Sequence, residues 1–178
     1  KKNPLPSGFW QRIWEYPYVA INVPKKSKTI DVGGTYPFVL FKNWPDAVSV
    51  DNRDLNKVKH PLLKNQWPKD KLIIADATNI PVKTNVYDYS ISISAIEEMP
   101  NTVKVLKEMI RIAKHRVVVT LDVSEKLGVN RNLLRELEKY LGITLPTIPH
   151  NVLNSNDQRI TQYNQPILDE YKHIRVLG

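Results

Sequence analysis

The sequence contains no cysteine in its 178 residues. This absence excludes disulfide bonds, metal sites built on thiolates and every mechanism that uses a thiol nucleophile. A chain without disulfides fits a reducing compartment, so we expect an intracellular, cytoplasmic protein. The sequence predicts no metal site.

Long apolar runs are also missing, since no stretch approaches the roughly 20 residues that a membrane-spanning helix needs. We therefore expect no membrane partner. No signal peptide is visible either, although the chain starts at Lys1 rather than at a methionine, which leaves the natural N-terminus open. The sequence shows no internal repeat and no low-complexity segment.

Acidic residues are fewer than basic ones, 18 against 26, which gives a net charge of +8. The excess lies in residues 1–83, with 14 basic and 7 acidic side chains, whereas residues 84–178 carry 12 and 11. A basic half can attract a polyanion such as RNA, but a solvated lysine-rich face is the commoner explanation. A composition of 42% hydrophobic and 25% charged residues is typical of one globular domain at this length.

Glycine is scarce, yet two of the six glycines, Gly33 and Gly34, directly follow a predicted strand at 29–32. A second predicted strand at 47–50 is closed by Asp51. Ligands of open parallel sheets bind at the carboxyl ends of the strands, where glycine lets the backbone approach them and an acid can accept both hydroxyls of a ribose. The dinucleotide pattern has three glycines, so this turn indicates a nucleotide site without naming the nucleotide, and a tight turn with no ligand is the alternative.

Hydrophobic periodicity predicts alternating strands and helices up to Gly142. This order predicts an α/β fold with a doubly wound, mostly parallel sheet and right-handed crossovers, in three αβα layers. Asn101 is expected to cap one helix and Gly142 to end another. Besides the strands named above, we expect strands at 72–75, 87–93 and 116–121 and helices that start at Pro37 and span 52–59, 101–115 and 129–141.

The N-terminal segment 8–23 is rich in aromatic side chains that are too apolar to remain in water. A helix is expected to start after Ser7 and to break at Pro17. The segment either covers the open edge of the sheet or forms a lid over a ligand at Gly33, and the two roles are compatible.

The C-terminal part begins with a loop at 143–157, followed by predicted strands at 159–163 and 173–177. Their short connection predicts an antiparallel pair on one sheet edge and a seven-stranded sheet in all. We expect a single domain, with an N-terminal lid segment at 1–23, a core at 24–142 and the loop with its closing strands at 143–178.

Four motifs, in order, resemble those of the class I S-adenosylmethionine-dependent methyltransferases over residues 27–123. The acid and glycine turn of the family's first motif resemble Asp31-Val32-Gly33-Gly34. The family's ribose acid is similar to Asp51, and its adenine acid to Asp76 in the segment ADATNIPV. The signature of its fourth strand is matched by YDYSISISAIEEM at 87–99.

The resemblance implies S-adenosylmethionine as the cofactor and a role for each matching residue. The glycines would lie against the methionine part, with a carboxylate near its ammonium group. Carboxylates would also accept the ribose hydroxyls and the adenine amino group. The residues expected to bind the cofactor are Asp31, Gly33, Gly34, Asp51, Asn52, Asp76, Ala77 and Ser94, the last of which would face the sulfonium and the acceptor.

Candidate general bases are Glu97, Glu98 and His150. The alternative for the two glutamates is a structural role at a helix start, and for His150 a place in a loop. The motif Asn/Asp-Pro-Pro-aromatic of base-amine methyltransferases is absent after the fourth strand, and without cysteine a pyrimidine carbon cannot be activated covalently.

Three functional hypotheses follow. The first is a methyltransferase that acts on a small-molecule or saccharide-type acceptor. The second keeps the cofactor but takes RNA or protein through the basic N-terminal half. The third is a cofactor-binding module without transfer, favoured because Thr35, Tyr36 and Pro37 stand where the family has further glycines. The sequence leaves the oligomeric state open, with a homodimer among the options.

Overall fold

The computed structural model describes residues 12–34, 36–59, 66–121, 131–142 and 174–177. Its helices are α1 (Arg12–Asn22), α2 (Pro37–Asn43), α3 (Thr102–Ile112) and α4 (Arg131–Leu141), with short 3-10 helices η2 (Lys69–Lys71) and η3 (Ile96–Glu98). Its strands are β1 (Thr29–Val32), β2 (Val48–Asp51), β3 (Leu72–Ile74), β4 (Tyr87–Ile93), β5 (Ala113–Thr120) and β6 (Ile174–Leu177).

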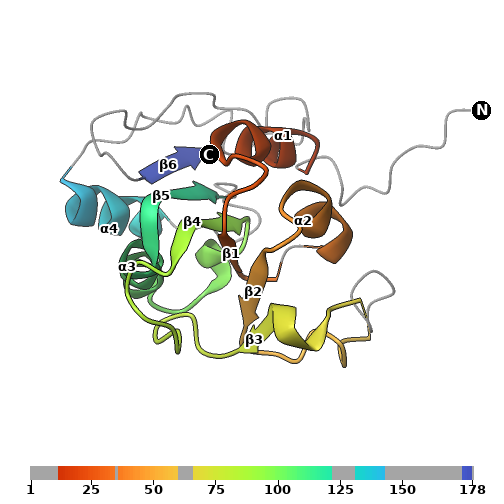
Figure 1. Ribbon diagram of the computed structural model, residues 1–178. Helices are drawn as coiled ribbons and strands as arrows, with labels where there is room; N and C mark the ends of the chain where they lie inside the picture. Colours follow the sequence, from red (N-terminus) through yellow and green to blue (C-terminus); the bar gives the residue numbers. More distant parts are fainter. Residues whose placement is uncertain (1–11, 35, 60–65, 122–130, 143–173, 178) are drawn as a thin grey trace, which may run out of the picture.

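The strands form a six-stranded sheet in the order β3-β2-β1-β4-β5-β6 (Figure 1). Every described neighbour pair is parallel, which confirms the predicted parallel α/β sheet. The chain adds strands outward in one direction from β1 to β3, and then returns to the other side of β1 with β4. Ligands of such folds bind at this reversal point, outside the carboxyl ends of the strands.

The described sheet contains only one strand of the antiparallel pair predicted at the C-terminus. Its last strand, β6, lies beside β5 and runs parallel to it, with Thr120 opposite Leu177. The other expected strand, at 159–163, lies outside the described residues. Within the described part the sheet therefore has six strands, all parallel, and the seventh stays a prediction.

Two hydrophobic cores lie on opposite faces of the sheet, which confirms the three layers (Figure 1). One core packs α3 and α4 against alternate residues of the strands, such as Val117 and Val119. The other packs α1 and α2 against residues that point the opposite way, such as Val118 and Ile91. The continuous apolar run of β5 is thereby explained, because both of its faces are covered.

Three local expectations were wrong. The helix α1 continues through Pro17, because burial of Val19 and Val23 holds it although proline lacks the N–H that would bond to the preceding turn. The expected helix at 52–59 is a set of turns, in which carboxylates accept backbone N–H groups that a helix would use. The predicted helix at 101–115 ends at Ile112, because Ala113 pairs with Tyr87 as the first residue of β5.

Two other local predictions, at Pro37 and Gly142, were confirmed, whereas the cap expected from Asn101 was not. Pro37 stands at the first position of α2, where its missing N–H costs nothing. Gly142 follows α4 with φ +68°, the left-handed conformation that ends helices. Asn101 precedes α3 as expected, but it also has a positive φ and its side chain makes no capping hydrogen bond.

Candidate functional site

The turns that follow β1, β2 and β3 lie side by side at the carboxyl edge of the sheet. The Gly33 N–H donates to the Val50 carbonyl at 2.9 Å, and the Ala75 N–H donates to the Asp51 carbonyl at 3.0 Å. These two bonds extend the ladder of the sheet just past the strand ends. They bring the glycine turn, the acid of β2 and the loop after β3 together.

The glycine turn fits its surroundings only because it has no side chains. Gly33 and Gly34 have φ of +110° and +70°, a region that other residues rarely adopt. A Cβ on Gly33 would lie 2.3 Å from the Ala95 Cβ, and one on Gly34 would lie 2.8 Å from an Asp51 carboxylate oxygen. The turn therefore touches the segment after β4 on one side and the acid of β2 on the other.

Asp51 lies at the end of β2, and its carboxylate is bound by Arg53. Asp51 Oδ1 accepts the backbone N–H of Arg53 at 2.8 Å and its Nε–H at 2.9 Å, while Oδ2 accepts Nη2–H at 3.1 Å. The pKa of Arg53 is raised, chiefly by this hydrogen bond and by the Asp51 charge, with a smaller contribution from the charge of Glu98. Because the Arg53 side chain is 63% exposed, it can turn into solvent and free the carboxylate.

Asp76 lies in the loop after β3 and is exposed to solvent. Its Oδ1 accepts the backbone N–H of Thr78 at 2.8 Å, and hydrogen bonds from Thr78 lower the pKa of Asp76. The carboxylate is thus ionised at neutral pH and lies at the surface. Two further residues expected to bind the cofactor also lie at this edge: Ala77 is half-buried, and Asn52, in the turn after β2, is exposed.

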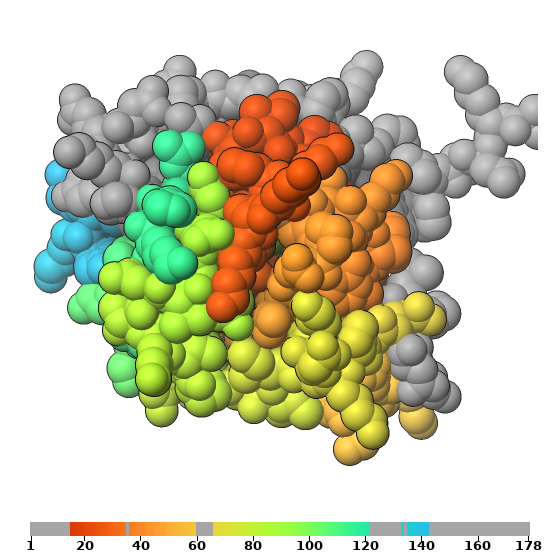
Figure 2. Space-filling view, viewed as in Figure 1, coloured from red at the N-terminus to blue at the C-terminus, as the bar shows by residue number. Residues whose placement is uncertain are grey.

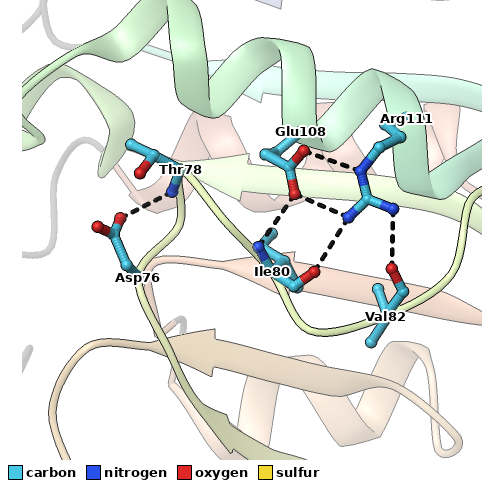
Figure 3. A network of polar contacts seen from close by, with 6 residues as sticks. All are labelled: Asp76, Thr78, Ile80, Val82, Glu108 and Arg111. Atoms are coloured by element: carbon cyan, nitrogen blue, oxygen red, sulfur yellow. Dashed lines mark hydrogen bonds and ion pairs between the residues drawn. The ribbon is translucent and has the colours of Figure 1, made fainter.

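The loop that carries Asp76 is fastened to α3 by one ion pair (Figure 3). Arg111 donates to Glu108 at 2.8 and 2.7 Å and to the carbonyls of Ile80 and Val82 at 3.0 and 2.8 Å. Glu108 in turn accepts the backbone N–H of Ile80 at 3.0 Å. The pKa of Glu108 is lowered, first of all by its hydrogen bonds from Arg111.

Asp31 differs from these acids because it lies inside β1 rather than at the open edge. Its side chain is fully buried and accepts the Ser49 hydroxyl of the neighbouring strand at 2.8 Å. This contact joins β1 to β2 directly beneath the glycine turn. Any role toward a cofactor stays a prediction for Asp31.

A second polar cluster, which the sequence did not reveal, lies at the ends of β4 and β5. Glu15 of α1 is 7% exposed, and its Oε1 accepts the hydroxyls of Ser94 and, at 2.9 Å, of Thr120. Ser94 has φ +43°, and its N–H donates to the Thr120 carbonyl at 3.0 Å. The only signal for Glu15 was a lone acid within the aromatic segment GFWQRIWEYPYV, and Thr120 gave none.

Two of the three candidate general bases, Glu97 and Glu98, lie in η3. Glu98 is exposed at the end of η3, on the Arg53 side of the glycine turn, and the neighbouring Glu97 is half-buried. His150 lies outside the described residues. Tyr36, which stands where the family has glycine, stacks on the exposed Phe38 with 5.8 Å between the ring centroids.

The side chains at this edge fit an adenosine cofactor in their chemistry. Carboxylates accept hydrogen bonds from hydroxyl and amino groups, which are the donors of a ribose and an adenine. Asp51 and Asp76 end or follow neighbouring strands, and the bare backbone of the glycine turn follows the next strand along.

No helix among the described residues is long and apolar enough to cross a membrane. Within the same part of the chain, no three His, Asp or Glu side chains are grouped so that they could hold a metal ion.

Comparison with known families and structures agrees with this geometry. A family model described as a methyltransferase domain matches residues 33–126, just over half of the chain. No curated protein matches the sequence significantly.

Three solved structures are similar to this chain, and the first two below, with TM-scores above 0.5, share its fold. A protein from Pyrococcus horikoshii is 21% identical, with a TM-score of 0.51 and coverage of 81% of this chain and 68% of its own. The methyltransferase in a complex with the Trm112 activator of Haloferax volcanii is 15% identical, with a TM-score of 0.52 and coverage of 76% and 68%. A SAM-dependent methyltransferase from Thermotoga maritima is 18% identical, with a TM-score of 0.49. The match covers 74% of this chain and only 62% of that protein.

Proposed function

The chain belongs to the methyltransferase domain family, within the class I S-adenosylmethionine-dependent methyltransferases of Rossmann-like fold, and we propose that it methylates a small molecule. The observation that carries the proposal is the alignment of Gly33, Asp51 and Asp76 at one edge of the parallel sheet. Ligands of this fold class bind at that edge.

Each residue at the edge has a proposed role in holding the cofactor. Asp51 accepts the ribose hydroxyls, and Asp76 accepts the adenine amino group beside the Ala77 backbone. The turn at Gly33 and Gly34 lies against the methionine part. The ion pair of α3 supports these roles, because it fixes the loop that carries Asp76.

The distribution of charge supports a small acceptor over a nucleic acid. Three carboxylates, Asp51, Asp76 and Glu98, lie at the carboxyl edge; Arg53 there is paired with Asp51, and the charge of Lys104 acts on Asp76. A larger group of lysines lies at the opposite edge, just before or at the beginning of strands. They are Lys25, Lys26 and Lys28 before β1, Lys69 and Lys71 before β3, and Lys114 in β5.

Figure 2 shows the red segment that leads into β1 in the middle of the view, with lime-green and turquoise atoms on one side of it and orange atoms on the other. In a parallel sheet the two edges are separated by the length of the strands. A polyanion drawn to the lysines would therefore lie away from the cofactor residues. A small acceptor meets no such conflict.

The cofactor supplies a methyl group on a positively charged sulfonium, and transfer to the acceptor is a direct displacement. The work left to this chain is to align the acceptor and to exclude water. A hydroxyl acceptor also needs its proton removed. We propose Glu98 for that step, since its exposed carboxylate stands at the same edge.

The proposal is tested by titration calorimetry with S-adenosylmethionine and S-adenosylhomocysteine. We expect binding of both, and a loss of affinity of about tenfold or more in Asp51→Asn, because hydrogen bonds to a charged acceptor contribute about 1.5–3 kcal/mol. Asp46→Asn is the matched control, since Asp46 lies before β2 at the opposite edge and is 89% exposed. Absence of binding to the wild-type protein at high micromolar cofactor would contradict the proposal.

The basic first half of the sequence favours RNA as a second candidate acceptor. This alternative predicts RNA binding that weakens steeply as salt rises. Binding of this kind that is also lost when Lys25, Lys26 and Lys28 are replaced by glutamine would favour RNA over a small molecule.

A further inference from the structure

We infer that Glu15 is a cofactor-discriminating residue, whose buried carboxylate favours the positively charged sulfonium of S-adenosylmethionine over the neutral thioether of the demethylated product. The inference rests on the proposed function. It assigns a role to the N-terminal helix α1, which lies outside the segment matched by the family model.

The position of Glu15 follows from three successive contacts. The glycine turn touches the segment after β4, since a Cβ on Gly33 would lie 2.3 Å from the Ala95 Cβ. Ala95 directly follows Ser94, whose hydroxyl donates to Glu15. The carboxylate of Glu15 is therefore one residue removed from the turn that receives the methionine part of the cofactor.

The order of strands along the sheet points to the same position. Asp76 follows β3 and Asp51 ends β2, so the adenosine lies over that side of the sheet. The rest of the cofactor must extend past Gly33 at the end of β1 toward β4, which is the next strand in the order. The sulfonium is attached directly to the adenosine, and Glu15 lies over the ends of β4 and β5.

The surroundings of Glu15 are suited to an ionised carboxylate. A buried carboxylate is costly unless hydrogen-bond donors replace the water that it gives up. Ser94 and Thr120 both donate their hydroxyls to Oε1, and Thr120 Oγ1 also accepts the Ser94 N–H at 3.1 Å. Because Glu15 is only 7% exposed, its charge is screened less by water and salt than that of a surface acid.

The same contacts anchor α1 to the sheet, and this structural role has to be separated from discrimination by charge. Glu15→Gln separates them, because a glutamine oxygen can accept both hydroxyls while the negative charge is removed. If Glu15 serves only as an anchor, this variant behaves like the wild-type protein. If its charge acts on the sulfonium, only the affinity for the cationic cofactor falls.

The experiment measures the dissociation constants of S-adenosylmethionine and S-adenosylhomocysteine by titration calorimetry, for the wild-type protein and Glu15→Gln. We expect the affinity for S-adenosylmethionine to fall about five- to tenfold, and that for S-adenosylhomocysteine to stay within about twofold, as for one partly screened charge pair. Asp88→Asn is the matched control. This half-buried carboxylate pairs with Lys114 at the opposite end of β4, and its loss should leave the ratio of the two affinities unchanged.

Two results would overturn the inference. A ratio of affinities that is the same in Glu15→Gln and the wild-type protein would show that the charge does not act on the sulfonium. An equal loss for both ligands would show that Glu15 acts on a group that they share, such as the ammonium of the methionine part. If the wild-type protein binds neither ligand, the proposed function itself fails, which is distinct from both results.

Discussion

The carboxyl edge of the sheet has two halves that are built in different ways. One half comprises Gly33, Gly34, Asp51 and Asp76, which end strands β1 to β3 or lie in the turns after them, and we call it the adenosine half after the role proposed for its two acids. The lid half, formed by Glu15, Ser94 and Thr120, brings together residues that are 79 and 105 positions apart in sequence. Local turn chemistry makes the first, and packing of α1 on the sheet makes the second.

This difference predicts which substitutions will disturb each half. The adenosine half depends on backbone conformation and on short-range hydrogen bonds, such as that from the Thr78 N–H to Asp76. The lid half depends on a helix staying in place, and its two hydroxyls, of Ser94 and Thr120, donate to a single oxygen of Glu15. The two halves touch where Gly33 meets Ala95, and the largest expected effect lies at that contact.

Gly33→Ala should destabilise the protein by about 3 kcal/mol, because the new Cβ would lie 2.3 Å from the Ala95 Cβ and φ is +110°. In thermal unfolding this corresponds to a fall in Tm of about 6–12 °C for a chain of this size. Circular dichroism melts of the purified variant provide the measurement.

The double variant Gly33→Ala/Ala95→Gly tests the cause of that loss. Removing the Ala95 methyl group makes room for the new one but leaves the backbone strain. We expect the two substitutions to couple by at least about 1 kcal/mol in a double-mutant cycle. Strict additivity would show that the two halves of the edge are not in contact at this point.

The positions of the residues in the adenosine half could be predicted from the sequence, because each is tied to a strand end by a short local pattern, while their roles toward the cofactor stay predictions. Strands β1 and β4 were predicted with their observed bounds, since period and composition suffice for buried strands. Asp51 was assigned to the end of β2 because an acid closes an apolar run there. Its partner Arg53, two residues on, was missed, since a turn that folds an arginine back onto an acid has no distinctive pattern.

The lid half could not be predicted in the same way. Glu15 was visible as an acid in an aromatic segment, but its contact with Thr120 depends on where α1 packs, which no local pattern fixes. The expected break at Pro17 would have moved the helix, and burial of Val19 and Val23 prevents it. The direction of β6 was likewise unpredictable, because the sequence of a short strand does not show whether it runs parallel or antiparallel to the strand beside it.

A second prediction concerns the loop of the adenosine half. Glu108→Gln should cost about 2 kcal/mol, because an amide has only one acceptor oxygen. If that oxygen takes the place of Oε2 and accepts from Arg111 and the Ile80 N–H, the amide NH2 faces the Arg111 Nε–H, which then has no acceptor. Hydrogen exchange should rise in the 76–86 loop, while the α1 segment of the lid half stays unchanged. Glu136→Gln, on the exposed side of α4, is the control and should leave both stability and exchange as they are.

The loss of stability in Glu108→Gln should also become smaller as the pH falls. The folded-state pKa of Glu108 is lowered, so its contribution is complete above the ordinary glutamate pKa of about 4.3 and is lost as pH falls through the lowered value. The difference in stability between wild type and Glu108→Gln should therefore be constant near neutral pH and shrink below about pH 4. A difference that grows on acidification would be inconsistent with the ion pair as its source.

The smallest expected effect comes from replacing Arg53, which already occupies most of the Asp51 carboxylate. A carboxylate has about four acceptor positions, and the three hydrogen bonds from Arg53 leave too few for both hydroxyls of a ribose. Cofactor binding then requires the Arg53 side chain to turn away. Because exposed ion pairs contribute about 0–1 kcal/mol, Arg53→Gln should tighten S-adenosylmethionine binding by no more than about fivefold.

Lys57→Gln is the matched control for Arg53→Gln, since Lys57 forms a comparable exposed pair with Asp54 three residues away, at 3.1 Å. Its loss should leave the dissociation constant unchanged in the same calorimetric titration. Weaker binding in Arg53→Gln would reverse the interpretation. Arg53 would then contact the cofactor itself, and the adenosine half would depend on a cation that its neighbouring acid holds in place.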